Sequence, residues 1–296
     1  MDWLNAIAEW ISAREHRLPI GEWSKVAVDW ATTNFEWFFD AITFGLRFVL
    51  EGTAKVLVAV PSPLLILIIT GIAYLLQRSW KLAVFTFLGL LLILNFDQWT
   101  AAVETMVLVI YATLSSLLIG VPIGILAARR PVFYQMMSPV LDLMQTLPTF
   151  VYLVPVLIFF GLGPVPGLIA TIIFVVPAPI RLTYLGISQV QKPLIEAGES
   201  FGCTRWQLLI KVKLPAALPT IMAGVNQTIM LSLSMAVIAA LVGARGLGAP
   251  VVRALNQRNV PLSVEAGIAI VVLAIVLDRM LKQRARAKKI AKAPKA

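Results

Sequence analysis

Residues 196–215 read EAGESFGCTRWQLLIKVKLP and lie in a polar segment, residues 187–220, between two long apolar runs. We expect a short helix over residues 195–201, with Glu196 in its first turn, where an acid interacts favourably with the helix dipole. Gly202 would then let the chain turn sharply or approach a partner's backbone closely. Such a helix would project from a membrane domain and fit a groove in a soluble subunit.

The composition on both sides of this segment indicates a membrane protein. Apolar residues make up 59% of the 296 residues and charged residues 14%, whereas about 25% of the residues in soluble proteins are charged. A helix needs about 20 apolar residues to cross the hydrocarbon core. We therefore predict an all-α, polytopic transmembrane bundle of about seven spans. The spans are expected at residues 56–76, 82–96 (a short one), 101–127, 139–161, 167–186, 221–243 and 262–281.

The distribution of charge predicts the orientation of the chain. The last 18 residues, from Arg279 onward, carry eight bases and no acid, whereas residues 1–55 carry eight acids and five bases. Because short loops rich in Lys and Arg stay in the cytoplasm, we predict a cytoplasmic C-terminus and an outer N-terminus in a bacterial inner membrane. The expected outer loop at residues 244–261 carries three arginines against this trend, but the basic tail outweighs it.

Residues 1–55 lack the basic and apolar regions of a cleaved signal peptide. We expect amphipathic helices at the membrane surface instead, because tryptophans recur on one helical face with charges on the other. A packed soluble cap is the alternative. The residues that share these faces are Trp3, Ile7 and Trp10, and then Trp23, Trp30 and Trp37.

Several functional classes are excluded by what the sequence lacks. One cysteine and one histidine exclude a disulfide framework and a multi-histidine metal site, and no GxxxxGK[ST] phosphate-binding loop occurs. We expect no catalytic residue, metal or cofactor in this chain. The net charge of +10 is concentrated in the tail, which indicates orientation, or lipid sensing, rather than a nucleic-acid partner. Ionisable groups are nearly absent from the centres of the spans, so energy for uphill transport would come from another polypeptide.

The polar segment resembles the EAA loop of ATP-binding-cassette (ABC) importer permeases. In that loop, E-A-A is followed after three residues by G and after nine more by I-x-L-P. This chain has the same spacing, with Gly198 in place of the second alanine and Val212 in place of isoleucine. A generic amphipathic surface helix is the alternative. The resemblance implies that the residues coupling the permease to its ATPase are Glu196, Ala197, Gly198, Gly202, Leu214 and Pro215.

Further segments are similar to the permeases of glycine betaine, proline betaine and choline importers. They are residues 141–155, 179–183, 219–230, 240–248 and 277–279. The similarity covers roughly residues 56–282 and implies a type I (MetI-like) importer core. It implies two accessory spans at 56–100, a five-helix core at 101–281 that includes the EAA loop at 187–220, and a basic cytoplasmic tail at 282–296. The implied partners are a second copy of the permease, cytoplasmic ABC ATPase subunits that bind ATP and magnesium, and an extracytoplasmic substrate-binding protein.

Polar side chains at membrane depth are the candidates for a translocation path. Gln145, Thr149 and Tyr152 would share one helix face at i, i+4 and i+7. The other candidates, in the sixth span, are Asn226, Gln227 and Ser234. Such groups either line a hydrated path or link helices by hydrogen bonds, and the sequence leaves both readings open. Prolines within the fourth and fifth spans would direct those helices inward or simply kink them.

We predict a permease subunit of an ATP-driven importer for quaternary ammonium compatible solutes: glycine betaine, proline betaine or choline. A permease for an amino acid such as histidine is the first alternative, because those systems look similar at this level. A secondary carrier that works alone would need an internal repeat or ionisable groups at the midplane, and neither is visible. A membrane-bound assembly protein would transport nothing.

Overall fold

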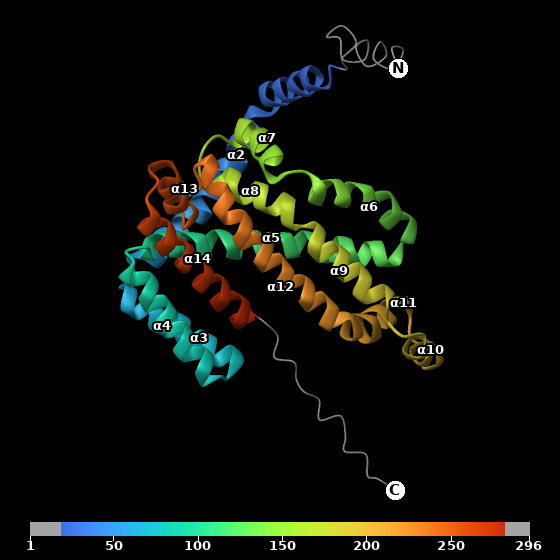
Figure 1. The fold of residues 1–296 in the computed structure, drawn as a ribbon. Coiled ribbons are helices and arrows are strands. Elements are labelled where there is room, and N and C mark those ends of the chain that lie inside the picture. Colours follow the sequence, from blue (N-terminus) through green and yellow to red (C-terminus); the bar gives the residue numbers. More distant parts are fainter. Residues whose placement is uncertain (1–18, 282–296) are drawn as a thin grey trace, which may run out of the picture.

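The computed structural model describes residues 19–281, and the regular structure in this range is entirely helical (Figure 1). The predicted all-α class is therefore confirmed. The expected helical face of Trp3, Ile7 and Trp10 and the basic tail at 282–296 lie outside the described residues. The helices are α2 (Ile20–Ala59), α3 (Ser62–Gln77), α4 (Trp80–Asn95), α5 (Trp99–Arg129), α6 (Pro131–Thr146), α7 (Thr149–Phe160), α8 (Pro164–Val175), α9 (Pro177–Ser188), α10 (Lys192–Ser200), α11 (Arg205–Leu208), η2 (Leu209–Lys213), α12 (Leu214–Ile238), η3 (Ala239–Val242), α13 (Gly248–Gln257) and α14 (Val260–Leu281).

The centre of the bundle is α9, which packs against both α5 and α12. Glycines allow these helices to approach closely. A Cβ atom at Gly124 would lie 2.6 Å from the Cβ of Thr183 and 2.7 Å from the carbonyl oxygen of Ile180. A Cβ at Gly224 of α12 would lie 3.0 Å from the Cβ of Leu182. Small residues at helix contacts are typical of membrane proteins, where lipid gives helices no hydrophobic reason to associate and close packing must do so.

Four helical stretches are long and apolar enough to cross a membrane: 99–129, 164–188, 205–242 and 260–280. They correspond to the expected spans at 101–127, 167–186, 221–243 and 262–281. The helix at 80–95 matches the expected short span but has only 16 residues. The described residues thus contain four to six candidate spans, and the expected count of seven is not confirmed.

Two of the expected spans, 56–76 and 139–161, are bent. The chain turns by 107° between α2 and α3 and by 95° between α6 and α7. Val60 and Leu147 precede the prolines at these bends and are extended, with ψ of 132° and 135°. The ring of a proline disfavours the helical conformation in the residue before it. Each proline therefore ends one helix and starts the next, whereas the predicted spans at 56–76 and 139–161 run through it.

The remaining helices flank the central three. Buried side chains of α3, α4 and α14 form one apolar core with α5 and α12. The helix α2 lies along α5, where the hydroxyls of Thr53 and Tyr111 are hydrogen-bonded at 2.9 Å. Its N-terminal part projects from the bundle (Figure 1), and its Trp23, Trp30 and Trp37 are all exposed. The helices α10 and α11 lie at one end of the bundle and α13 at the other (Figure 1).

Candidate functional site

The expected short helix exists as α10, but it begins three residues earlier, at Lys192. Glu196 consequently lies in the second turn, so the expected interaction of its carboxylate with the first-turn dipole does not apply. Gly202 follows the helix with φ of 72°, a conformation that glycine adopts without strain. Its N–H donates to the carbonyl of Glu199 at 2.9 Å, and the N–H of Cys203 donates to that of Gly198 at 3.1 Å. The chain therefore turns sharply at Gly202, as the sequence predicted.

The two halves of the EAA-like motif meet at Gly198. A Cβ atom there would lie 2.7 Å from Cδ1 of Leu208 and 3.3 Å from Cγ2 of Val212. Gly198 is buried, and α10 packs on η2 through this contact. The departures from the family's motif at positions 198 and 212 thus lie against each other. A smaller residue at 198 makes room for the side chains of the second half.

The second half of the motif continues directly into a membrane helix. Thr204 and Gln207 form a capping box at the start of α11: the Gln207 N–H donates to the Thr204 hydroxyl, and the Gln207 side chain accepts from the Thr204 N–H. The helix then runs unbroken to Val242, with Pro215 in the first turn of α12 and Pro219 inside it. Pro219 does not interrupt this helix. The second half of the motif and α12 therefore belong to one continuous helical stretch.

The outer surface of this segment carries apolar side chains that the sequence analysis did not single out. Phe201 is 89% exposed at the C-terminal end of α10, beside the exposed Glu196 and Ala197. Trp206 is also exposed, and the guanidinium of Arg129 lies 4.4 Å from the centre of its ring. The sequence did contain a signal for these side chains, because an aromatic residue is unusual within an otherwise polar loop. Aromatic residues, Phe among them, are enriched in the buried cores of protein–protein interfaces.

Gln145, Thr149 and Tyr152 do not share one continuous helix face. The bend at Leu147 places Gln145 on α6 and the other two on α7. Tyr152 is buried, and its hydroxyl donates back across the bend to the carbonyls of Met144 and, at 3.5 Å, of Leu143. In the described structure this hydroxyl links the two helices. Gln145 and Thr149 are half-buried near the bend.

The three candidates on α12 divide between its two faces. Gln227 and Ser234 are exposed and lie seven residues apart, on the same side as the exposed Met230. The hydroxyl of Ser234 donates to the carbonyl of Met230 at 3.2 Å. The Oδ1 atom of Asn226 is buried and accepts no hydrogen bond within residues 19–281. Buried polar atoms normally have a partner, so this unpaired oxygen keeps Asn226 a candidate for the path.

Two glycine-rich turns, at residues 161–163 and 243–248, meet at the opposite end of the bundle. The N–H of Gly163 donates to the carbonyl of Val242 at 3.1 Å. Further along, Gly246 has φ of 123°, and the next residue, Leu247, donates its N–H to the Thr105 hydroxyl of α5 at 2.8 Å. These bonds fix the loop that precedes α13 against α5 and α8.

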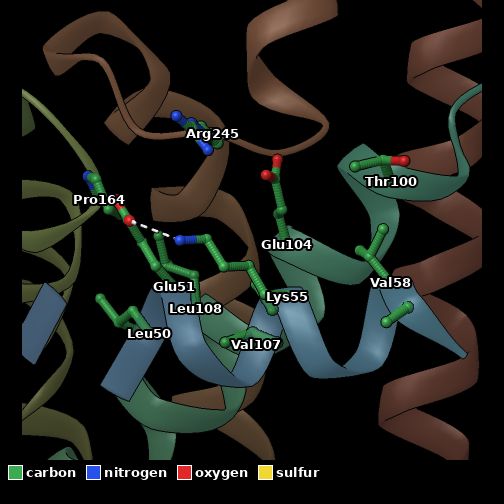
Figure 2. A pocket seen from close by; sticks show the side chains of 12 residues that line it. Leu50, Glu51, Lys55, Val58, Thr100, Glu104, Val107, Leu108, Pro164 and Arg245 are labelled. Atoms are coloured by element: carbon green, nitrogen blue, oxygen red, sulfur yellow. Dashed lines mark ion pairs between the residues drawn. The ribbon is translucent and has the colours of Figure 1, made fainter. Parts of the chain in front are cut away.

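A cavity of about 340 Å³ lies beside this loop, between α2 and α5. Figure 2 shows its mostly apolar wall, with the carboxylate of Glu104 and the guanidinium of Arg245 in the upper part. Glu51 and Lys55 form an ion pair of 4.0 Å at its edge. Arg245 is one of the three arginines that ran against the predicted charge distribution. The structure gives a local reason for it, because it faces the same cavity as an acid.

The family of the chain follows from comparison with known proteins. Residues 120–289 match the family model described as binding-protein-dependent transport system inner membrane component. The chain is 47% identical over 264 residues to the glycine betaine transport system permease protein OpuAB of Bacillus subtilis, covering 89% of this chain and 93% of that one. It is 45% identical over 266 residues to the glycine betaine/carnitine transport permease protein GbuB of Listeria monocytogenes, covering 89% and 94%.

It is also 43% identical over 263 residues to the glycine betaine/proline betaine transport system permease protein ProW of Escherichia coli, covering 89% of this chain and 74% of that one. Two solved structures of the MetNI methionine ABC transporter in inward-facing conformations resemble the fold, with TM-scores of 0.54 and 0.57. They cover 60% and 62% of this chain and 91% and 94% of theirs, at 22% identity. This likeness confirms the predicted type I permease fold.

Proposed function

Because the chain belongs to the family of binding-protein-dependent transport system inner membrane components, we propose that it moves glycine betaine, proline betaine or choline across the membrane. It is a transport permease subunit and not an enzyme. The cargo assignment rests on one observation: the chain is 43–47% identical to three permeases that are named for glycine betaine.

The candidate lining agrees with such a cargo. Gln145, Thr149, Gln227 and Ser234 offer amides and hydroxyls and no charge. In a low-dielectric environment, the attraction between a carboxylate and a permanent cation reaches several kcal/mol. A charged lining would therefore hold a quaternary ammonium group and slow its release. A neutral, hydrated lining lets the solute leave once its binding protein has released it.

The cargo is tested by reconstituting the permease with its ATPase and substrate-binding protein in lipid vesicles. Labelled glycine betaine, proline betaine, choline and histidine are followed into the vesicles with and without ATP. We expect ATP-driven uptake of a quaternary ammonium solute and none of histidine. ATP-driven histidine uptake that excess betaine and choline do not inhibit would disprove the cargo and leave the importer intact.

We also propose that α10 and its C-terminal turn dock into the ATPase. The support is the exposed Phe201 beside Glu196 and Gly202, on a segment that continues without a break into α12. In this arrangement two permease copies assemble with ATPase subunits at the α10 end, which is cytoplasmic, and with the binding protein at the α13 end. The N-terminus is then outside and the C-terminus in the cytoplasm.

The docking is tested with Phe201→Ala. This side chain is 89% exposed, so its removal should leave the permease's own stability unchanged. Loss of an interface anchor costs more than about 1.4 kcal/mol, or tenfold in affinity. We expect ATPase co-purification and substrate-stimulated hydrolysis to fall by about that factor. Leu255→Ala on α13, also exposed but at the other end, is the control for co-purification, which does not involve the binding protein. Equal ATPase co-purification by the two variants would refute the docking assignment.

A further inference from the structure

A second cavity, of about 550 Å³, lies behind the EAA-like segment. It is enclosed by the C-terminal end of α5, by α9 at Ile187, by α10 at Glu199 and by α11 and η2. Neither the family match nor the coupling proposal assigns it a role. The coupling surface around Phe201 faces outward, whereas this cavity lies between the coupling segment and the membrane helices.

The lining of this cavity is strongly basic. Four cationic side chains border it, those of Arg129, Arg130, Arg205 and Lys213, against the single carboxylate of Glu199. Within residues 19–281, no carboxylate oxygen lies within 4.0 Å of any of these cations, since the ion pairs found there are Glu51–Lys55 and Asp142–Arg181. Arg129 is held over the ring of Trp206. The positive charge is thus gathered in one hollow and is not neutralised by the described chain.

The floor of the cavity is apolar. Leu126, Ile187, Leu208 and Leu209 form it, and the last three are buried. From the length of α5, we expect the cavity to lie at the depth of a lipid headgroup. The 31 residues of α5 extend about 46 Å at 1.5 Å per residue, more than the roughly 30 Å hydrocarbon core. Arg129 and Arg130 come after its apolar stretch and therefore reach the membrane–water boundary.

We propose that this cavity binds a phosphate-bearing anion. Guanidinium groups hold phosphate oxygens by paired, charge-assisted hydrogen bonds, and basic hollows between helices at the membrane surface suit anionic headgroups. The phosphate comes either from a phospholipid or from solution. A bound phosphate bridges α5 to α11 and η2, and so holds the base of α10 in place. This consequence for coupling rests on the proposed function, whereas the binding itself does not.

The chain offers a matched pair of variants. Lys213 and Lys211 lie two residues apart in η2, and only Lys213 borders the cavity. Lys213→Gln and Lys211→Gln remove the same charge from the same element. The purified permease is placed in nanodiscs of neutral phosphatidylcholine, with or without phosphatidylglycerol. Bound lipid is then measured by native mass spectrometry. In the neutral discs, inorganic phosphate is titrated against chloride at equal ionic strength while thermal stability is followed.

If the source is a phospholipid, wild type and Lys211→Gln retain phosphatidylglycerol and Lys213→Gln retains about fivefold less, the effect of one basic side chain near an anionic surface. If the source is soluble, phosphate but not chloride raises the melting temperature, and only Lys213→Gln loses this effect. Equal responses of the two variants in both arms would overturn the site. Lys213→Gln could also lower ATPase co-purification while changing neither lipid retention nor the response to phosphate. That result would overturn the phosphate site and would indicate that Lys213 pairs with an acidic side chain of the ATPase. Neither arm needs transport, so failure of the cargo assay leaves this test unaffected.

Discussion

Gly246 combines two constraints that no other residue type satisfies. Its φ of 123° is strained for any side chain, and a Cβ would lie 2.5 Å from Oγ1 of Thr105, the atom that accepts from Leu247 N–H. Backbone strain costs about 1–3 kcal/mol and overpacking about 1–3 kcal/mol more. We expect Gly246→Ala to lower the stability of the permease by at least about 2 kcal/mol, measured as a lower melting temperature in detergent.

The control for this prediction is Gly267→Ala. Gly267 lies within α14, and a Cβ there would meet nothing within 4 Å. Alanine favours a helix over glycine by about 0.5–1 kcal/mol, so this variant should be as stable as wild type or slightly more so. Equal melting temperatures for the Gly246 and Gly267 variants would show that the loop before α13 is not fixed against α5.

Gly198 should tolerate alanine, the residue that the EAA motif has at this position. The nearest obstacle to a Cβ is Cδ1 of Leu208, the end of a flexible side chain, at 2.7 Å. A rotamer change of that leucine costs about 1 kcal/mol. We expect Gly198→Ala to keep ATPase co-purification, and Gly198→Ile to lose it, because a branched side chain would separate α10 from η2. Loss of co-purification already with alanine would contradict this reading.

At the scale of the helices, much could be predicted from the sequence, because apolar runs of 20 or more residues have few alternatives in a membrane. The stretches at 99–129, 164–188 and 260–280 lie where expected. The two bends could not be predicted. Pro122 and Pro219 continue their helices, whereas Pro61 and Pro148 start new ones. Each proline disfavours a helix in the residue before it, and only the packing of the neighbouring elements selects between a kink and a break.

The candidate site was predictable to a similar extent. The EAA-like spacing located α10 and the turn at Gly202, since a local motif encodes a local structure. It did not reveal that Gly198 packs on Leu208, or that Arg129 stacks on Trp206, 77 positions further along the chain. Contacts between elements depend on how the helices are arranged, and a linear pattern does not contain that arrangement.

The bend between α6 and α7 can be tested through Tyr152. Its hydroxyl donates to the carbonyls of Met144 and Leu143, so Tyr152→Phe removes a link between the two helices. A hydrogen bond of this kind contributes about 0.5–1.5 kcal/mol. We expect a modest decrease in melting temperature and an unchanged KM for uptake. Unchanged stability with a raised KM would instead show that the hydroxyl contacts the cargo and lines the path.

At the scale of the whole molecule, the two ends of the bundle are chemically different. One end carries α10, the basic cavity and the exposed Phe201. The other carries α13 and the two glycine-rich turns, with acids and arginines side by side around Glu104. This asymmetry suits a subunit that meets a motor on one side and a solute donor on the other. In the proposed coupling, the helical stretch from residue 205 to residue 242 connects the α10 end to the rest of the bundle.

The chain's single cysteine tests this orientation without any mutation. Cys203 follows Gly202 at the α10 end and is partly exposed. We expect a membrane-impermeant maleimide to label it in inside-out vesicles and not in intact cells with a permeable outer layer, because the basic segments predict a cytoplasmic location for that end. A Cys203→Ser variant that also carries Leu255→Cys, exposed on α13, should show the reverse pattern. Adding the ATPase should protect Cys203 and leave the residue at 255 reactive.

Labelling of Cys203 from outside and of position 255 from inside would show that the orientation is the reverse of the predicted one. Labelling of both from one side would contradict the placement of α10 and α13 on opposite faces of the membrane.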